Sequence, residues 1–192
     1  MVELPRLYKN VYNKPFQLPS ELNEEKVELD AEAIKKKMID DLTATLKLYL
    51  REKQIKLFDV NEILQDKELH SAVLENSSID QQFSDPQKIL AMAVEAMVKT
   101  GEICRRRDKK HTYESLLLPD SEMSAFILKL LQKEKCQNIY AEKGCHVMRV
   151  FSEIKKTLRY ADVGMSSVRY CLDQLEMNSD IIRSTDSHYV AC

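Results

Sequence analysis

Glycine is scarce in this sequence, and the few glycines stand alone. Gly101, Gly144 and Gly164 are the only three in a chain of 192 residues. A loop that cradles phosphate needs several glycines close together, because the backbone must approach the phosphate closely. The sequence therefore excludes a glycine-rich nucleotide-binding loop.

Long apolar runs are also missing. The apolar runs, such as those within residues 115–118 and 125–128, are only a few residues long. A membrane-spanning helix needs roughly 18 apolar residues. We therefore expect a protein that does not span a membrane.

The charge is nearly balanced, with a formal net charge of -2. Such a balance creates no overall field that would draw the chain onto nucleic acid or an anionic membrane. Binding of that kind must come from a local patch. The apolar fraction of 44% and the charged fraction of 31% are typical of a soluble globular protein.

The cysteines form no paired framework. Their number is odd, no signal peptide precedes them, and they are scattered at Cys104, Cys136, Cys145, Cys171 and Cys192. We interpret them as reduced thiols of an intracellular protein.

Cys145 and His146 raise the question of zinc binding or nucleophilic catalysis. Cys136 lies nine residues before Cys145, but no Cys-x-x-Cys or His-x-x-x-His pair completes a zinc site. Nothing supplies an orienting third group or an oxyanion site for a nucleophile. We expect no metal, no cofactor and no enzymatic activity, with Cys145 as a small buried residue and His146 near a helix start.

Helical periodicity is clear in the first part of the chain. Apolar residues recur every three or four positions over residues 31–52, after an acidic stretch at 20–30 that we interpret as a solvated linker. Asp59 can cap a shorter helix, with one or two further turns near residues 69–74. Asp85 and Pro86 begin a helix that Gly101 ends, and residues 102–106 and 111–117 form a hairpin.

A similar order follows in the second part. Asp120 or Ser121 caps a helix, Gly144 precedes a second, and Ser166 opens a third. Residues 181–182 and 189–191 then form a closing hairpin.

Three helices followed by a hairpin, twice over, predict a mainly α fold with small β-hairpins (α+β). We interpret it as two tandem winged helix-turn-helix domains, over residues 29–118 and 120–192, with a lead-in and linker at 1–28. This architecture is typical of a binding module.

The strongest candidate for a nucleic-acid-binding site is the tip of the first hairpin. It carries Arg105, Arg106, Arg107, Lys109 and Lys110, interrupted by one aspartate. Such a cluster attracts a phosphate backbone without reading sequence. The alternative is a solvated turn.

A second candidate lies at the start of the last predicted helix. Ser166, Ser167 and Arg169 would face a DNA groove if this helix were a recognition helix. The alternative is a solubilising surface.

Apolar side chains in the lead-in favour protein recognition. They need a surface to cover, either on this chain or on a partner. They are Tyr8, Tyr12, Phe16, Leu18, Leu22 and Val27.

Short segments at both ends carry a family resemblance. They are Glu3-Leu4-Pro5 with Tyr8, Val11-Tyr12, Pro15-Phe16, Glu142-Lys143-Gly144-Cys145-His146, Ser179-Asp180-Ile181-Ile182 and His188-Tyr189. Together they resemble the carboxy-terminal half of the Stn subunit of the CST (Ctc-Stn-Ten) telomere complex. Between residues 23 and 118 mainly the helix pattern is similar.

The resemblance implies a nuclear, telomeric protein without enzymatic activity. In that family the tandem winged helices dock onto the large Ctc subunit and onto DNA polymerase alpha-primase, which fills in the C-rich strand. An OB-fold, which is not part of this sequence, would hold the small Ten subunit and telomeric single-stranded DNA. The basic hairpin departs from the family, whose equivalent turn can be acidic, so the resemblance does not imply a DNA contact at this wing throughout the family. The alternative function is direct DNA binding by the wing and the last helix.

Overall fold

The chain divides into two compact units, Met1–Lys37 and Met38–Cys192. The computed structural model describes the backbone of residues 20–77, 85–135 and 143–192, and the side chains of 32–75, 85–134 and 143–192. The lead-in side chains that we expected to cover a surface of this chain or of a partner lie outside these ranges, as does Cys136.

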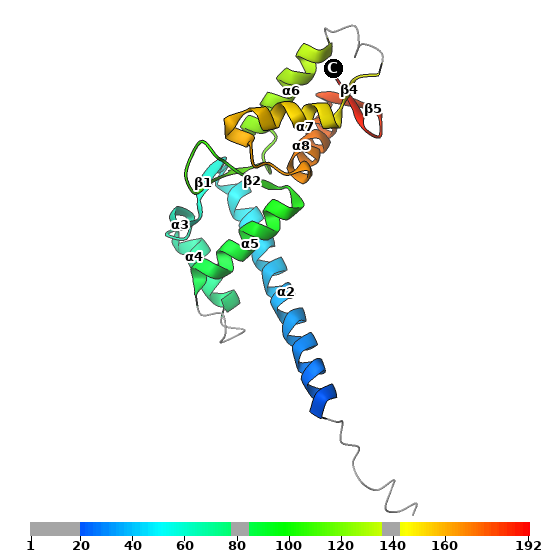
Figure 1. The fold of residues 1–192 in the computed structure, drawn as a ribbon. Helices are drawn as coiled ribbons and strands as arrows, with labels where there is room; N and C mark the ends of the chain where they lie inside the picture. The colour runs from blue at the N-terminus through cyan, green and yellow to red at the C-terminus, as the bar shows by residue number, and fades with distance from the viewer. Residues whose placement is uncertain (1–19, 78–84, 136–142) are drawn as a thin grey trace, which may run out of the picture. The chain divides into compact units, whose positions relative to one another are not determined.

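Up to residue 115, the described part of the chain consists of helices and one short sheet (Figure 1). The elements are α2 (Ser20–Glu52), β1 (Leu57–Asp59), α3 (Val60–Ile63), α4 (Lys67–Ser77), α5 (Pro86–Thr100), β2 (Ile103–Arg105) and β3 (Thr112–Ser115). The strands are antiparallel in the order β1-β3-β2, so the predicted hairpin of β2 and β3 is confirmed.

The chain after residue 120 repeats this arrangement with a second sheet. The elements are α6 (Glu122–Lys135), β4 (Cys145–His146), α7 (Val147–Lys156), the 3-10 turn η2 (Leu158–Tyr160), α8 (Met165–Met177), β5 (Ile181–Thr185) and β6 (His188–Ala191). The strand order is β4-β6-β5, again antiparallel. The mixed α+β character predicted from the sequence is confirmed.

The predicted helix boundaries are confirmed where a capping residue marks them. Asp59 and Asp85 each accept a hydrogen bond from the backbone two residues later, at the starts of α3 and α5. Gly101 ends α5 in a left-handed conformation with φ 90°. Ser121, whose hydroxyl accepts from the Ser124 backbone, caps α6.

The prediction for residues 20–30 was wrong in one respect, because this acidic stretch is helical. Helix α2 begins at Ser20 and not near residue 31. Glutamate, leucine and lysine are good helix formers, and acidic residues near the amino end interact favourably with the helix dipole. A lack of apolar residues therefore did not mean a lack of helix.

Two hydrophobic cores lie within Met38–Cys192, and the β2–β3 hairpin contributes to both. Ile103 and Leu117 belong to the core lined by α2, α4 and α5, whereas Cys104 and Leu116 belong to the core of α6, α7 and α8. Successive side chains of a strand point to opposite faces. The hairpin is therefore a wall shared by the two cores.

None of the helices in the described ranges is both long and apolar enough to cross a membrane.

Candidate interaction site

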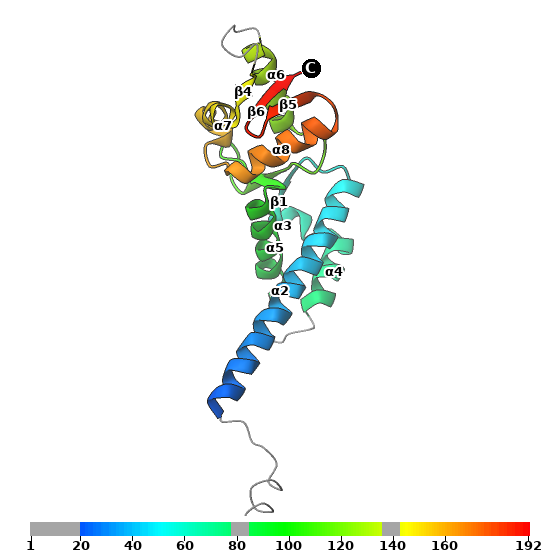
Figure 2. The ribbon, with the colours of Figure 1, turned by 90° about the vertical axis from the view of Figure 1, so that its right-hand side faces the viewer.

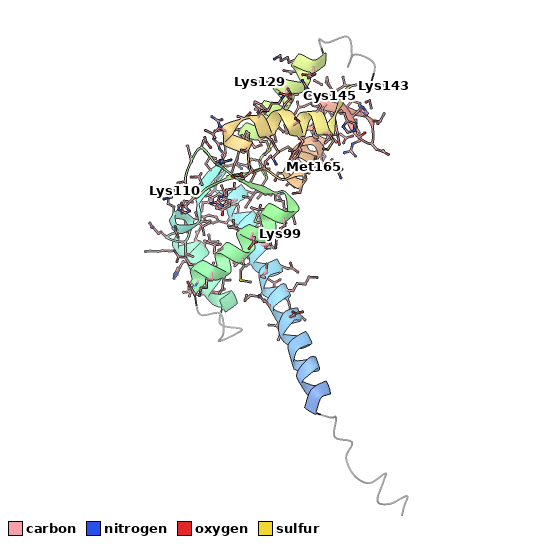
Figure 3. All side chains as sticks on the ribbon, in the orientation of Figure 1. Lys99, Lys110, Lys129, Lys143, Cys145 and Met165 are labelled. Atoms are coloured by element: carbon pink, nitrogen blue, oxygen red, sulfur yellow. The ribbon has the colours of Figure 1, made fainter. Side chains whose placement is uncertain are left out.

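The charged turn predicted as a phosphate-binding tip connects β2 and β3. Arg105 lies opposite Tyr113 in the β2–β3 register, and the turn contains His111 at a positive φ of 57°. Figure 3 labels Lys110 in this turn. The five basic residues of the turn do not share one environment, because the structure buries one of them.

Arg106 is buried, with 3% of its surface exposed. Its Nε and Nη2 donate to both carboxylate oxygens of Asp108 at 2.8 Å, and its Nη1 donates to Glu114 and Glu122, each at 3.0 Å. The guanidinium also lies over the Tyr160 ring, 5.5 Å from its centroid. The hydrogen bonds to Asp108, then to Glu122 and Glu114, raise the pKa of Arg106. The guanidinium is thus committed to internal partners.

Glu114 is the deepest member of this cluster and is fully buried. Its Oε1 accepts from the Met123 backbone at 2.8 Å, in the first turn of α6, and its Oε2 accepts from the Tyr160 hydroxyl at 2.9 Å and from Arg106. A carboxylate is favourable at a helix amino terminus, where backbone N–H groups are unpaired. Burial and the nearby Glu114 carboxylate raise the pKa of Tyr160.

Arg159 completes the cluster at its exposed side. Its Nη1 donates to Glu122 at 2.7 Å, and its Nε lies 3.5 Å from Asp108. The hydrogen bonds from Arg106 lower the pKa of Asp108 to about 2. We call these six residues the polar joint: Arg106, Asp108, Glu114, Glu122, Arg159 and Tyr160.

Sequence reasoning missed most of the polar joint. Glu114 follows Tyr113 in a strand whose later residues are buried, so an acidic residue there should have indicated a buried partner. Its partners come from far along the chain: Glu122 opens α6 and Tyr160 ends η2. No local spacing relates them, which is why no motif marked them.

The other basic residues of the turn are exposed. Arg105, Lys109 and Lys110 are on the surface, and the Arg107 side chain is 57% exposed, with Asp162 at 3.7 Å. The backbone N–H of Arg107 donates to the carbonyl of Arg159 at 3.1 Å. The structure therefore brings the hairpin turn next to η2.

The candidate residues Ser166, Ser167 and Arg169 lie in the first turns of α8, apart from the charged turn. Ser167 is 1% exposed and Ser166 is half-buried, while Arg169 is exposed. A Cβ atom on Gly101 would lie 2.7 Å from the Ser167 nitrogen, so the first turn of α8 packs on the end of α5 (Figure 2). These residues lie beside the amino-terminal end of β2, whereas the charged turn follows its carboxy-terminal end. The two candidate sites are therefore at opposite ends of this strand.

Cys145 and His146 have structural roles in the described part of the chain. Burial raises the pKa of Cys145 to about 11. His146 caps α7, because its Nδ1 accepts from the Met148 backbone at 3.1 Å. Within the residues that the structure describes, no group of three or more His, Cys, Asp and Glu side chains could hold a metal ion.

Fold and site together define a mixed α+β protein in which two cores share a hairpin and a buried polar joint. Residues 36–192 match the family model described as "CST, complex subunit STN1, C terminal". The chain belongs to this family, as its resemblance to the Stn subunit predicted.

Curated relatives agree along the whole chain. It is 28% identical to "CST complex subunit STN1" of Danio rerio, over 99% of this chain and 52% of the relative. The corresponding proteins of Mus musculus and Homo sapiens are 26% and 22% identical, over 100% of this chain and 53% and 55% of theirs. The chain spans about half the length of the curated relatives it matches.

Proposed function

We propose that this chain is a non-enzymatic interaction module of a nuclear telomere-capping and replication complex. In this role it docks onto the large Ctc subunit and onto DNA polymerase alpha-primase, and so supports fill-in of the C-rich telomeric strand. The observation that carries the proposal is the family match over residues 36–192. The relatives from Danio rerio, Mus musculus and Homo sapiens are each named as a subunit of the CST complex.

We further propose that residues 29–118 and 120–192 are winged-helix domains, preceded by a lead-in and linker at 1–28. What supports this is the element order, since in each half a hairpin follows the helices and a short earlier strand, β1 or β4, joins its sheet. In the winged-helix arrangement, helices and a hairpin tip form the binding surface. The small Ten subunit and telomeric single-stranded DNA would then be held by an OB-fold outside this chain.

Co-elution on size-exclusion chromatography tests the docking role. The purified chain is mixed with the large Ctc subunit or with polymerase alpha-primase, and the proposal predicts that it elutes with each. A Leu90→Asp variant, which places a charge in the first core, should not co-elute, because docking requires the fold. Elution of the wild-type chain alone, apart from both partners, would contradict the proposal.

The second candidate function is direct binding of DNA by the hairpin and α8. One observation favours it: Arg105, Arg107, Lys109, Lys110 and Arg169 are all exposed. The other three candidate contacts, Arg106, Ser166 and Ser167, are buried or half-buried and could contribute only through their neighbours.

Fluorescence anisotropy against single-stranded and duplex DNA at two salt concentrations decides between the two functions. The matched variant changes Arg105, Arg107, Lys109 and Lys110 to alanine and keeps Arg106, so that the polar joint is intact. DNA binding that weakens steeply with salt, and that the variant loses, would establish the second function. The docking proposal predicts little binding to either DNA.

A further inference from the structure

Positive charge is concentrated in two segments that are distant in sequence. In residues 105–111 and 155–162, Lys and Arg outnumber Asp and Glu by eight to two, whereas over the whole chain Asp and Glu are in excess, 31 to 29. A positive island on an acidic protein creates a local potential that a negatively charged partner would feel.

The two segments meet in the folded chain. The Arg107 backbone donates to the Arg159 carbonyl at 3.1 Å, and the Arg107 guanidinium lies 3.7 Å from Asp162. Beneath them Arg106 binds Asp108 and Glu122, which also bind Arg159. The polar joint therefore holds the hairpin turn and η2 together. The two positive segments form one surface only when the hairpin packs against η2.

An exposed leucine lies among these charges. Leu158 begins η2, follows Lys155 and Lys156, and precedes Arg159, and it is 68% exposed. Covering this side chain with an apolar group of a partner would remove apolar surface from water, which favours binding.

Carboxylates within the surface argue against a phosphate backbone as its occupant. Asp162 lies beside Arg107, Glu122 beside Arg159 and Glu153 beside Lys156, so these three exposed cations are already partly neutralised. A duplex or single strand would bring closely spaced phosphates near these carboxylates and would leave Leu158 uncovered. A peptide can place its acidic groups further apart and can offer an apolar side chain.

We propose that the exposed side chains of Arg107, Lys109 and Lys110 form, with Leu158, one composite docking surface for an acidic segment of a partner protein. An apolar side chain of that segment covers Leu158, and its carboxylates pair with the surrounding cations. The proposal rests on the proposed role in protein docking. Its test uses neither of the partners named above, so either proposal can fail without the other.

The test is anisotropy of the full chain with three fluorescein-labelled probes of equal charge. One is a peptide of Glu-Glu-Leu repeats, one is a peptide of Glu-Glu-Ser repeats, and one is a single-stranded DNA. We expect the Glu-Glu-Leu peptide to bind most tightly. Leu158→Ser should weaken its binding about tenfold and leave Glu-Glu-Ser binding unchanged, because only the apolar contact is lost.

Two further variants locate the surface. Arg107→Ala combined with Lys109→Ala should weaken both peptides. Met177→Ser removes a side chain that is 77% exposed on α8 and should change neither. Equal affinity for the two peptides, tighter binding of DNA than of either peptide, or no binding to any probe would overturn the proposal, as would a Leu158→Ser variant that binds like the wild type.

Discussion

Arg106 carries a full charge in an environment with little water. Its side chain is 2% exposed, and the Glu114 side chain is 0% exposed. Burying one such charge alone costs several kcal/mol, and the cost is offset only when hydrogen bonds satisfy the whole group. Here three carboxylates and an aromatic face surround the guanidinium. Removing it would leave Glu114 buried without its strongest partner.

Arg106→Ala should therefore lower the free energy of unfolding by about 3–5 kcal/mol. Its neighbour Arg105 is exposed, so Arg105→Ala should shift the urea midpoint little. Urea denaturation followed by circular dichroism makes the comparison. Similar midpoints for the two variants would show that the polar joint does not stabilise the protein.

Acid should weaken the polar joint through Asp108. Its pKa is lowered to about 2 in the folded protein, against about 3.9 in an unfolded chain. The ionised carboxylate thus contributes stability that is fully present above about pH 4 and is lost as the pH falls toward 2. Urea titrations between these values should show a shallower loss of stability for Asp108→Asn than for the wild type. Parallel curves would contradict the assignment.

The charge run at residues 105–110 shows what sequence can and cannot reveal about single residues. The sequence predicted a basic turn, and most of its side chains are exposed as that prediction requires. Arg106 and Arg107 are adjacent and chemically identical, yet only one is buried. What distinguishes them is Glu114, Glu122 and Tyr160, which are brought near by tertiary structure alone.

The hairpin of β2 and β3 is buried between two cores near its start and is not simply an exposed wing. Because Ile103 and Cys104 point into different cores, the strand can expose neither face near its start. At the same place the first turn of α8 packs on Gly101. The hairpin, α5 and α8 therefore pack closely against one another, and a larger side chain at their contact would disturb all three.

Gly101→Ala tests this close packing. The added Cβ would lie 2.7 Å from the Ser167 nitrogen, and φ of +90° is unfavourable for alanine. We expect a loss of at least about 2 kcal/mol in the free energy of unfolding. Gly164→Ala is the matched control, since its Cβ would only touch the Ser166 hydroxyl at 3.4 Å, and it should cost about 1 kcal/mol or less. Equal effects would be inconsistent with the packing described.

Elements with strong local signals were predicted and weak ones were not. Asp59, Asp85 and Gly101 mark helix ends through backbone hydrogen bonds that depend on neighbouring residues only. Strands β1 and β4 are three and two residues long, too short to show an alternating pattern, and they form by pairing with β3 and β6. Their existence depends on partners far along the chain.

Within residues 38–192 the two cores should unfold together. They share the hairpin, and Tyr170 of α8 packs against both. The order of the longer helices and of the two hairpins could be predicted from the sequence because each of these patterns is local. The sequence could not predict that two cores share one hairpin. Both faces of β2 are apolar, and this pattern is equally compatible with a strand that is buried within a single core.

Single tryptophan reporters can test this coupling, since the chain contains no tryptophan. Tyr113→Trp reports on the first core and Phe151→Trp on the second, against which these residues pack. Both should give the same thermal midpoint by fluorescence, and the midpoints should separate when Arg106→Ala is added. Separate midpoints without that substitution would mean that the halves unfold independently.

We propose that this chain binds protein partners and does not read DNA, and one measurement tests this proposal most directly. In biolayer interferometry the chain is immobilised on the sensor at physiological salt. Binding of polymerase alpha-primase to it is compared with binding of telomeric single-stranded DNA. The account predicts saturable binding of polymerase alpha-primase and no measurable binding of the DNA. Binding of the DNA without binding of the polymerase would contradict it.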